Sequence, residues 1–143
     1  MTTRCPVPEP AVHEDALEYS PYPRSVSLAR RWGARLLTEW GMPQLAGDAA
    51  VLLTELAINA VLHGALPGRL FRVRLTLVGA TLRIAVTDPR GERVPRRRAP
   101  DPDDQFGRGL VIVEMLADRW GVEEHEIGKT VWCEISASAT RTR

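Results

Sequence analysis

Three polar side chains recur at every fourth position of an otherwise apolar segment: Glu55, Asn59 and His63. Residues four apart on a helix stand above one another, so these three form one polar line that can face a common ligand. An Asn amide oxygen is a suitable neutral ligand for Mg²⁺, which prefers oxygen donors and is usually shared with substrate phosphates. Glu55 can accept a proton from an attacking hydroxyl or water. We interpret the line as one wall of a site for a metal-bound phosphate chain; the alternative is a stripe that is merely solvated.

Asp88 follows the apolar run Ile84-Ala85-Val86-Thr87, so we expect its carboxylate to emerge where a strand meets a loop. A carboxylate accepts hydrogen bonds, so it can take the exocyclic amino group of adenine and reject guanine, which shows an acceptor there. The alternative is an Asp that starts a turn before Pro89. For His63, near the end of its helix, a capping or hydrogen-bonding role is favoured over catalysis.

Two glycines, Gly107 and Gly109, leave room for backbone N–H groups to approach a phosphate. We expect a helix to begin near Leu110 and to point its positive end the same way. Gly-x-Gly-Leu is a weak motif by itself, because glycines are common in loops.

A P-loop is excluded at Gly128-Lys129-Thr130, because Glu123 stands where that motif needs a glycine. The residues that follow, Val131 to Ile135, also have the pattern of a strand, where a P-loop needs a helix. Thr130 is instead a candidate second hydroxyl beside Asp88.

The elements that must position these residues are predicted from periodicity. Their order predicts an α+β fold, a two-layer sandwich of a mixed, mostly antiparallel sheet with about three helices on one face. The predicted helices are 25–40, 45–63 and 110–120, and the predicted strands are 16–19, 71–77, 82–86, 122–127 and 130–135.

With 143 residues, of which 44% are hydrophobic and 26% charged, the chain is expected to form one globular domain. We assign the domain to 13–137, between a flexible arm at 1–12 and a disordered tail at 138–143. The stretch 89–106 has four prolines and five arginines and no apolar period, so it is expected to be a mobile lid.

The net charge of +1 gives no global field toward nucleic acid or membrane, so we expect neither as a direct partner. The two cysteines, Cys5 and Cys133, form no metal-binding motif or disulfide scaffold, which favours a reducing compartment. The N-terminus lacks a signal core, and we expect no apolar run near the ~18 to 20 residues of a membrane span. A cytoplasmic protein is therefore expected.

Four motifs in this order resemble those of the ATP-binding domain shared by histidine kinases, heat-shock-90 chaperones, gyrase and MutL proteins, known as the Bergerat fold. The resemblance is closest to its small branch of anti-sigma-factor serine kinases, and it extends over 21–135. The motifs are the N box at Thr54 to Gly64, the first glycine box at Val86-Thr87-Asp88, the second at Gly107-Arg108-Gly109-Leu110 and the closing strand at Gly128 to Trp132.

This resemblance implies ATP and Mg²⁺ as cofactors. It departs from the family at Asp88-Pro89-Arg90-Gly91, where Gly91 is the single glycine, displaced by one position, and Arg90 stands where a glycine is expected. The resemblance implies that Glu55 is a general base, Asn59 a Mg²⁺ ligand and Asp88 an adenine contact. It implies that Gly107 and Gly109 are glycines of the phosphate lid, in the box that also holds Arg108 and Leu110. Thr130 is implied to support the adenine site.

By the same resemblance, the expected function is that of an anti-sigma factor and serine-protein kinase in transcription regulation. Its partners would be an anti-anti-sigma protein of the STAS type, phosphorylated on serine, and a sigma factor that the same surface sequesters; a homodimer is also compatible. The alternative is a non-catalytic protein-binding module gated by nucleotide, which the altered first glycine box favours.

Overall fold

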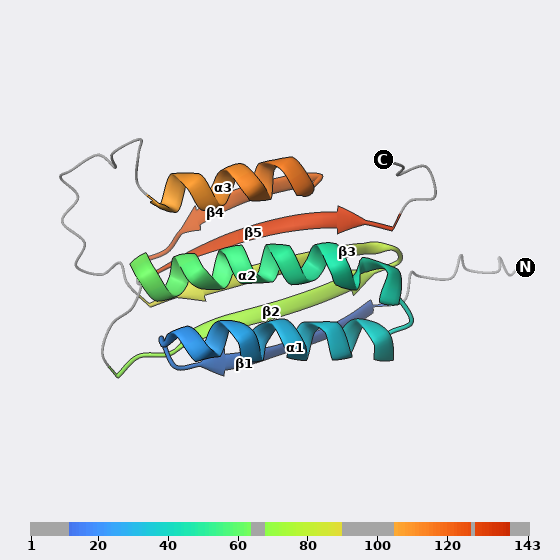
Figure 1. Cartoon of the computed structure of the whole chain (residues 1–143), viewed down its shortest axis with the longest axis horizontal. Helices are drawn as coiled ribbons and strands as arrows, with labels where there is room; N and C mark the ends of the chain where they lie inside the picture. The colour runs from blue at the N-terminus through green and yellow to red at the C-terminus, as the bar shows by residue number, and fades with distance from the viewer. Residues whose placement is uncertain (1–11, 64–67, 90–104, 127, 138–143) are drawn as a thin grey trace, which may run out of the picture.

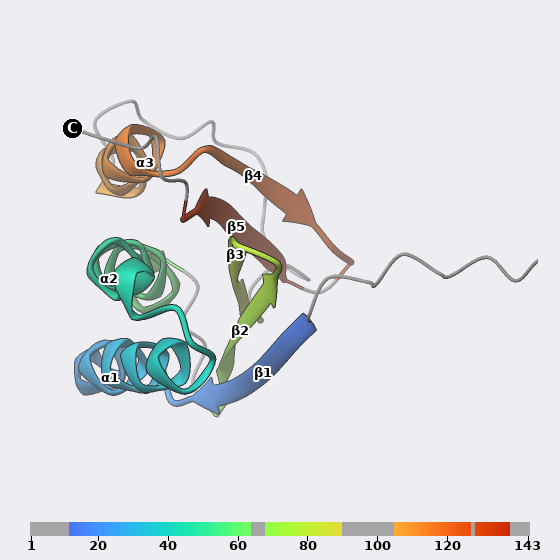
Figure 2. The same cartoon turned by 90° about the vertical axis from the view of Figure 1, so that its right-hand side faces the viewer.

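The computed structural model has three helices that cover one face of a five-stranded sheet (Figures 1 and 2), and it describes residues 12–63, 68–89, 105–126 and 128–137. The predicted two-layer α+β architecture is confirmed. The elements are β1 (Val12–Tyr19), α1 (Pro23–Glu39), a short 3-10 helix η1 (Pro43–Leu45), α2 (Ala46–His63), β2 (Phe71–Val78), β3 (Thr81–Asp88), α3 (Gln105–Leu116), β4 (Arg119–Glu124) and β5 (Lys129–Ser136).

The strands lie in the order β1-β2-β3-β5-β4, and every described pair is antiparallel, so the mixed sheet expected from the sequence is wholly antiparallel in this part of the chain. Alternate residues of β2 and β3 are buried, as the period-two pattern predicted. Ile84 and Val86 therefore face the helices, and across the pair to β5 they are opposite Cys133 and Val131. This alternation decides on which side of the sheet each polar side chain of the site lies.

Helix α2 is the centre of the hydrophobic core. Its buried face includes Leu52, Leu53 and Leu56, each at most 1% exposed, and burial of one such side chain contributes about 1.5–3 kcal/mol. The segment Pro43–Leu62 has a mean hydropathy of 1.6, enough by length and composition to cross a membrane, so the expectation that no apolar run has this length is wrong. Its packing against α1 and β3 explains the composition of this helix.

The edge strand β1 is longer than predicted, because all eight of its residues pair with β2. Ion pairs from Glu14 to Arg74 and from Glu18 to Arg72 accompany the pairing. Val12, assigned to the flexible arm, thus belongs to the sheet and is its first described residue. The rest of the predicted arm and the tail lie outside the described residues, as do positions 90–104 of the predicted lid.

The boundary between α3 and β4 was predicted wrongly. The helix covers 105–116 instead of 110–120, and the strand begins at Arg119 instead of Val122. Trp120 fits the helical spacing of the preceding apolar residues, but it pairs with Cys133 in the sheet and packs against the core from there. As a consequence, Gly107 and Gly109 lie inside the helix and do not precede it.

The turn before β5 brings two backbone segments into very close contact. Gly128 has φ +94°, and a Cβ atom placed on it would lie 2.0 Å from the carbonyl oxygen of Asp88. Only glycine allows both this conformation and this approach. Gly68 has a similar φ of +80°, but a Cβ atom there would meet nothing within 4 Å.

Gly128→Ala is therefore expected to lower the free energy of unfolding by at least about 3 kcal/mol. The matched Gly68→Ala change adds backbone strain without a collision and is expected to cost about 1–2 kcal/mol. Urea unfolding followed by circular dichroism measures both. Equal effects of the two substitutions would contradict the close approach at Gly128.

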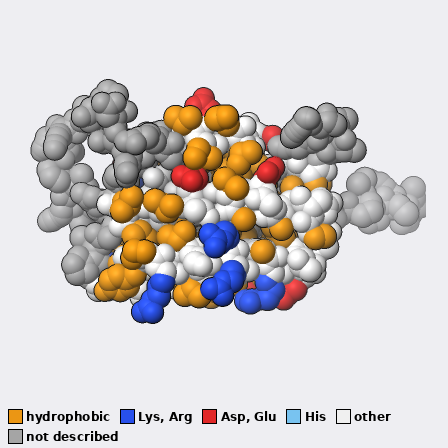
Figure 3. All heavy atoms as spheres, in the orientation of Figure 1, with side chains coloured by type: hydrophobic (Ala, Val, Ile, Leu, Met, Phe, Trp, Pro, Cys, Tyr) orange, Lys and Arg blue, Asp and Glu red, His pale blue; other side chains and the backbone are white. Residues whose placement is uncertain are grey.

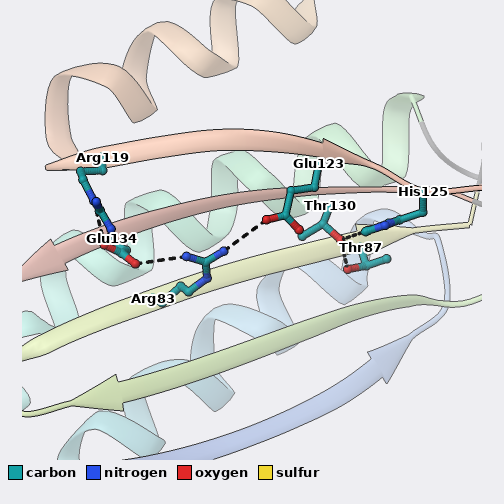
Figure 4. Close-up of polar contacts among 7 residues, drawn as sticks. All are labelled: Arg83, Thr87, Arg119, Glu123, His125, Thr130 and Glu134. Atoms are coloured by element: carbon teal, nitrogen blue, oxygen red, sulfur yellow. Dashed lines mark hydrogen bonds and ion pairs between the residues drawn. The ribbon is translucent and has the colours of Figure 1, made fainter.

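A charged cluster occupies the face of the sheet away from the helices (Figure 4). Glu134 accepts hydrogen bonds from Arg83 at 3.1 Å and from Arg119 at 2.7 Å, and the guanidinium of Arg83 lies 4.1 Å from the centre of the Trp132 ring. Burial alone would raise the pKa of Glu134, but the hydrogen bonds and charges of Arg119 and Arg83 outweigh burial and hold this pKa below its ordinary value of 4.5.

A carboxyl whose pKa is lower in the folded chain stabilises the fold above its ordinary pKa, and this contribution is lost as the pH falls through the lowered value. We expect Glu134→Gln to reduce the free energy of unfolding at pH 7 by on the order of 1 kcal/mol and to weaken the loss of stability below pH about 4.5. Urea titrations at pH 7, 5 and 3.5 measure this, with exposed Glu114→Gln as the control. A Glu134→Gln variant with the wild-type acid dependence would refute the assignment.

Candidate functional site

Four elements that carry the predicted motifs meet at one end of the molecule. Helix α2 and strand β3 end there, and α3 and β5 begin there (Figure 1). Asn59 is one turn from the end of α2, and Asp88 is the last residue of β3. The antiparallel pairing of β3 with β5 and the direction of α2 across the sheet thus bring together residues far apart in the sequence.

Asp88 lies on the helix-covered face of the sheet. It continues the alternation of Leu82, Ile84 and Val86, all of which are in the core, and it is only 4% exposed. Because α2 packs on β3 and β5, the carboxylate lies in the layer between the sheet and the helices. The prediction that Asp88 ends a strand is confirmed, and its side chain points inward.

Asn59 is 5% exposed, and its amide Nδ2 atom has no hydrogen-bond partner among the residues that the structure describes. Leaving such a donor buried and unpaired costs about 1–3 kcal/mol. A helix that could hold another apolar residue here instead holds an amide group. This buried, unpaired amide is the strongest structural indication of a ligand site.

Glu55 lies on the side of α2 that is turned away from α1. A Cβ atom on Gly33 of α1 would be 2.4 Å from Leu53 Cδ1, so α1 packs against the Leu53 side of α2. Glu55 is two residues further on, about 200° around the helix, and therefore points to the α3 side. It is partly buried, and Asn59, one turn later, lies between this side and the sheet.

Thr130 does not stand beside Asp88, and this prediction was wrong. Its hydroxyl lies on the open face of the sheet, 2.6 Å from the Thr87 hydroxyl and 2.8 Å from His125 Nε2 (Figure 4). Thr87 and Thr130 are paired residues of β3 and β5, and one residue of shift along a strand reverses the face on which a side chain lies. Thr130 therefore links the end of β3 to the start of β5 and to His125 on the face of the sheet away from the helices.

Lys129 is the residue of β5 directly opposite Asp88, and its side chain is on the same face of the sheet. The two are paired across the strands, and Lys129 has the same parity as Val131, Cys133 and Ile135, which are in the core. The prediction missed Lys129, although the alternation of these three residues already indicated its side. His125, which holds the Thr130 hydroxyl from the β4–β5 turn, was also missed, and no sequence pattern marks it.

Several predicted residues are only partly described. Gly107, Arg108 and Gly109 belong to the first turns of α3, where the first backbone N–H groups have no acceptor within the helix, but their surroundings lie outside the described residues. Leu110 is half-buried against the core. His63 ends α2, while its side chain, and all of Gly91 and Arg90, are outside the described part of the chain.

The donors at this end fit a nucleotide with Mg²⁺ better than a metal held by protein alone. Among the described residues no three His, Cys, Asp or Glu side chains come together as a metal cage. The amide oxygen of Asn59 is a ligand of the type that Mg²⁺ accepts when phosphates supply the others. The unpaired Nδ2 atom of Asn59 would then donate to a phosphate oxygen, which would remove the cost of burying it.

Comparisons with known proteins agree with this geometry. Residues 19–135 match the model of the histidine kinase-like ATPase domain. An uncharacterized protein from Streptomyces coelicolor is 42% identical over 66 residues, which are 43% of this chain and 61% of that protein. The family match extends over most of the chain and includes α1, α2, the β2–β3 hairpin, α3 and β5. The chain therefore belongs to the histidine kinase-like ATPase family of ATP-binding domains.

Proposed function

We propose that this protein binds ATP with Mg²⁺ and acts as an anti-sigma factor and serine-protein kinase in transcription regulation. The observation that carries the proposal is the buried, unpaired amide of Asn59, which lies at the same end of the molecule as the inward-facing carboxylate of Asp88. Family membership supports an ATP-binding regulatory role. The kinase activity, the serine specificity and the partners are part of the proposal.

The chemistry proposed for Glu55 is that of a general base. Bound ATP supplies the phosphoryl group. The Glu55 carboxylate would take the proton of a partner's serine hydroxyl while that oxygen bonds to the γ-phosphorus and the bond to ADP breaks. Glu55 is partly exposed, so a hydroxyl from outside can reach it. Asn59, one turn away, would hold the metal-bound phosphates, and most of the rate gain is expected from this positioning.

The proposed partners are an anti-anti-sigma protein of the STAS type and a sigma factor. Their binding is supported by the outer face of α3, where Val111, Ile112 and Met115 are 54%, 37% and 77% exposed. Hydrophobic side chains gather over this helix, whereas arginines line α1 (Figure 3). An apolar patch with a charged border is typical of a protein-binding surface.

A non-catalytic module gated by nucleotide is the second candidate. The specific observation in its favour is Arg90 at the position where the family has a glycine in the first glycine box. A larger residue there limits how closely the backbone can approach the nucleotide. In this case the exposed face of α3 would still bind the partner, but Glu55 would have no catalytic role.

Glu55→Gln is expected to lower the rate of serine phosphorylation of a cognate anti-anti-sigma protein at least about 100-fold, because the amide cannot act as a base. The Kd for ATP should change less than about threefold, since Glu55 is not proposed to bind the nucleotide. Radiolabelled ATP measures the transfer, and calorimetry measures the binding. The control is Glu39→Gln, at the exposed end of α1. Phosphorylation that Glu55→Gln leaves unchanged would refute the general base, and binding without any phosphorylation by the wild type would favour the second candidate.

Asn59→Leu is expected to have opposite effects on stability and on binding. Removal of the unpaired amide should leave the free energy of unfolding without ligand unchanged or raise it by about 1 kcal/mol. The affinity for ATP with Mg²⁺ should fall at least about 30-fold, equivalent to about 2 kcal/mol. Urea unfolding and calorimetry measure the two quantities. A variant that is destabilised and still binds ATP normally would show that Asn59 is structural.

A further inference from the structure

Glu55 lies between two exposed aliphatic side chains on the outer side of α2. Val51 and Leu62 are 41% and 56% exposed. A helix turns by about 100° per residue, so Val51, Glu55 and Leu62 fall within about 40° of one another around the axis and form one line. We call these three residues the outer ridge of α2. Its only charged group is the carboxylate in the middle.

The two aliphatic side chains of the outer ridge are not part of the hydrophobic core. Neither Val51 nor Leu62 belongs to the buried cluster or to the half-buried residues that pack against it. They instead continue the apolar outer face of α3, where Val111 and Met115 are exposed, because α2 and α3 pack against each other. Hydrophobic side chains lie over both helices in Figure 3. The carboxylate of Glu55 is therefore set within an exposed apolar surface.

The proposed reaction determines what must cover this ridge. A general base has to come within about 2.6–3.2 Å of the hydroxyl that it deprotonates, so the partner's serine must contact Glu55. Along the helix axis Val51 is about 6 Å from Glu55 in one direction, and Leu62 is about 10 Å away in the other. Both distances are short compared with the width of an ordinary protein interface. A partner whose serine reaches Glu55 therefore covers Val51 and Leu62 as well.

We propose that Val51 and Leu62 select the substrate, which is a serine set in an apolar protein surface with uncharged, apolar side chains on both sides of it. This inference rests on the proposed kinase function and narrows its substrate class. Apolar neighbours of the serine would remove both aliphatic side chains from water, which is favourable. A charged neighbour would be buried against an aliphatic side chain without a partner, which is unfavourable. The two residues position the partner and take no part in phosphoryl transfer.

Steady-state phosphorylation of a cognate anti-anti-sigma protein by the full chain, with Mg²⁺ and radiolabelled ATP, tests this selection. Val51→Gln and Leu62→Gln should each raise the KM for the partner protein at least about fivefold. The kcat should stay within about twofold, because the lost contacts are the same in the ground state and the transition state. The two positions are about 16 Å apart along the helix, so their effects should multiply to at least about 25-fold in the double variant.

Three further variants serve as controls. Val51→Ile and Leu62→Met keep an apolar side chain at each position and should leave the KM within about twofold of the wild type. Val78→Gln is the matched control, because Val78 is also 41% exposed but lies at the end of β2 on the open face of the sheet. It should change neither KM nor kcat. Circular dichroism establishes that each variant is folded, and calorimetry should give an unchanged Kd for ATP.

The outcomes separate this inference from the proposed function. Phosphorylation with an unchanged KM in both glutamine variants, a fall in kcat or in ATP affinity instead of a rise in KM, or an equal effect of Val78→Gln would overturn the selection by Val51 and Leu62. Each of these results would leave the kinase function intact. Absence of phosphorylation by the wild type would overturn the proposed kinase and, with it, this inference.

Discussion

The packing of α2 on the sheet is the interaction on which the rest of the structure depends. Most of its inward side chains are leucine and alanine, and they fill the layer above β3 and β5. At the end of this layer the pattern is broken by the amide of Asn59 and the carboxylate of Asp88, both at most 5% exposed. Burial of polar groups in an apolar layer is unfavourable unless they are paired. Asn59 Nδ2 has no partner among the described residues, so the fold accepts a local loss of stability at this amide, and such a loss is typical of a functional site.

The parity of the strands separates two kinds of polar residue. On the inner face, Asp88 and Lys129 are opposite each other and point toward the helices. On the outer face, Thr87, Thr130 and His125 form a chain of hydrogen bonds that fixes the strand ends. Adjacent residues in the sequence thus have different surroundings, because a strand directs successive side chains to opposite faces of the sheet. Neighbouring residues at the end of β3 and the start of β5 therefore lie on opposite faces of the sheet.

The bounds of helices and strands could be predicted from the sequence where apolar residues recur with a clear period. The prediction of these bounds failed where the period was ambiguous. Helix α2 and the β2–β3 hairpin were predicted to within a few residues, because their apolar positions recur clearly. Strand β1 has no such alternation, since its stability comes from pairing along a sheet edge. Trp120 fits a helix by spacing but lies in β4, because tertiary pairing with Cys133 overrides the local pattern. Asn59 and Asp88 lie at the same end of the molecule, whereas the Thr130 hydroxyl lies on the other face of the sheet from Asp88, which one residue of shift along a strand decides.

The central claim is that Asn59 and Asp88 face one bound nucleotide, and NMR spectroscopy of the ¹⁵N-labelled chain tests it most directly. Titration with ATP and Mg²⁺ should shift the side-chain amide signals of Asn59 and the backbone amides of Asp88 and Lys129, because ligand contacts occur on the inner face. The indole signal of Trp132, on the open face, should stay in place. Saturable shifts confined to the open face, or no shifts at millimolar ATP, would contradict the account.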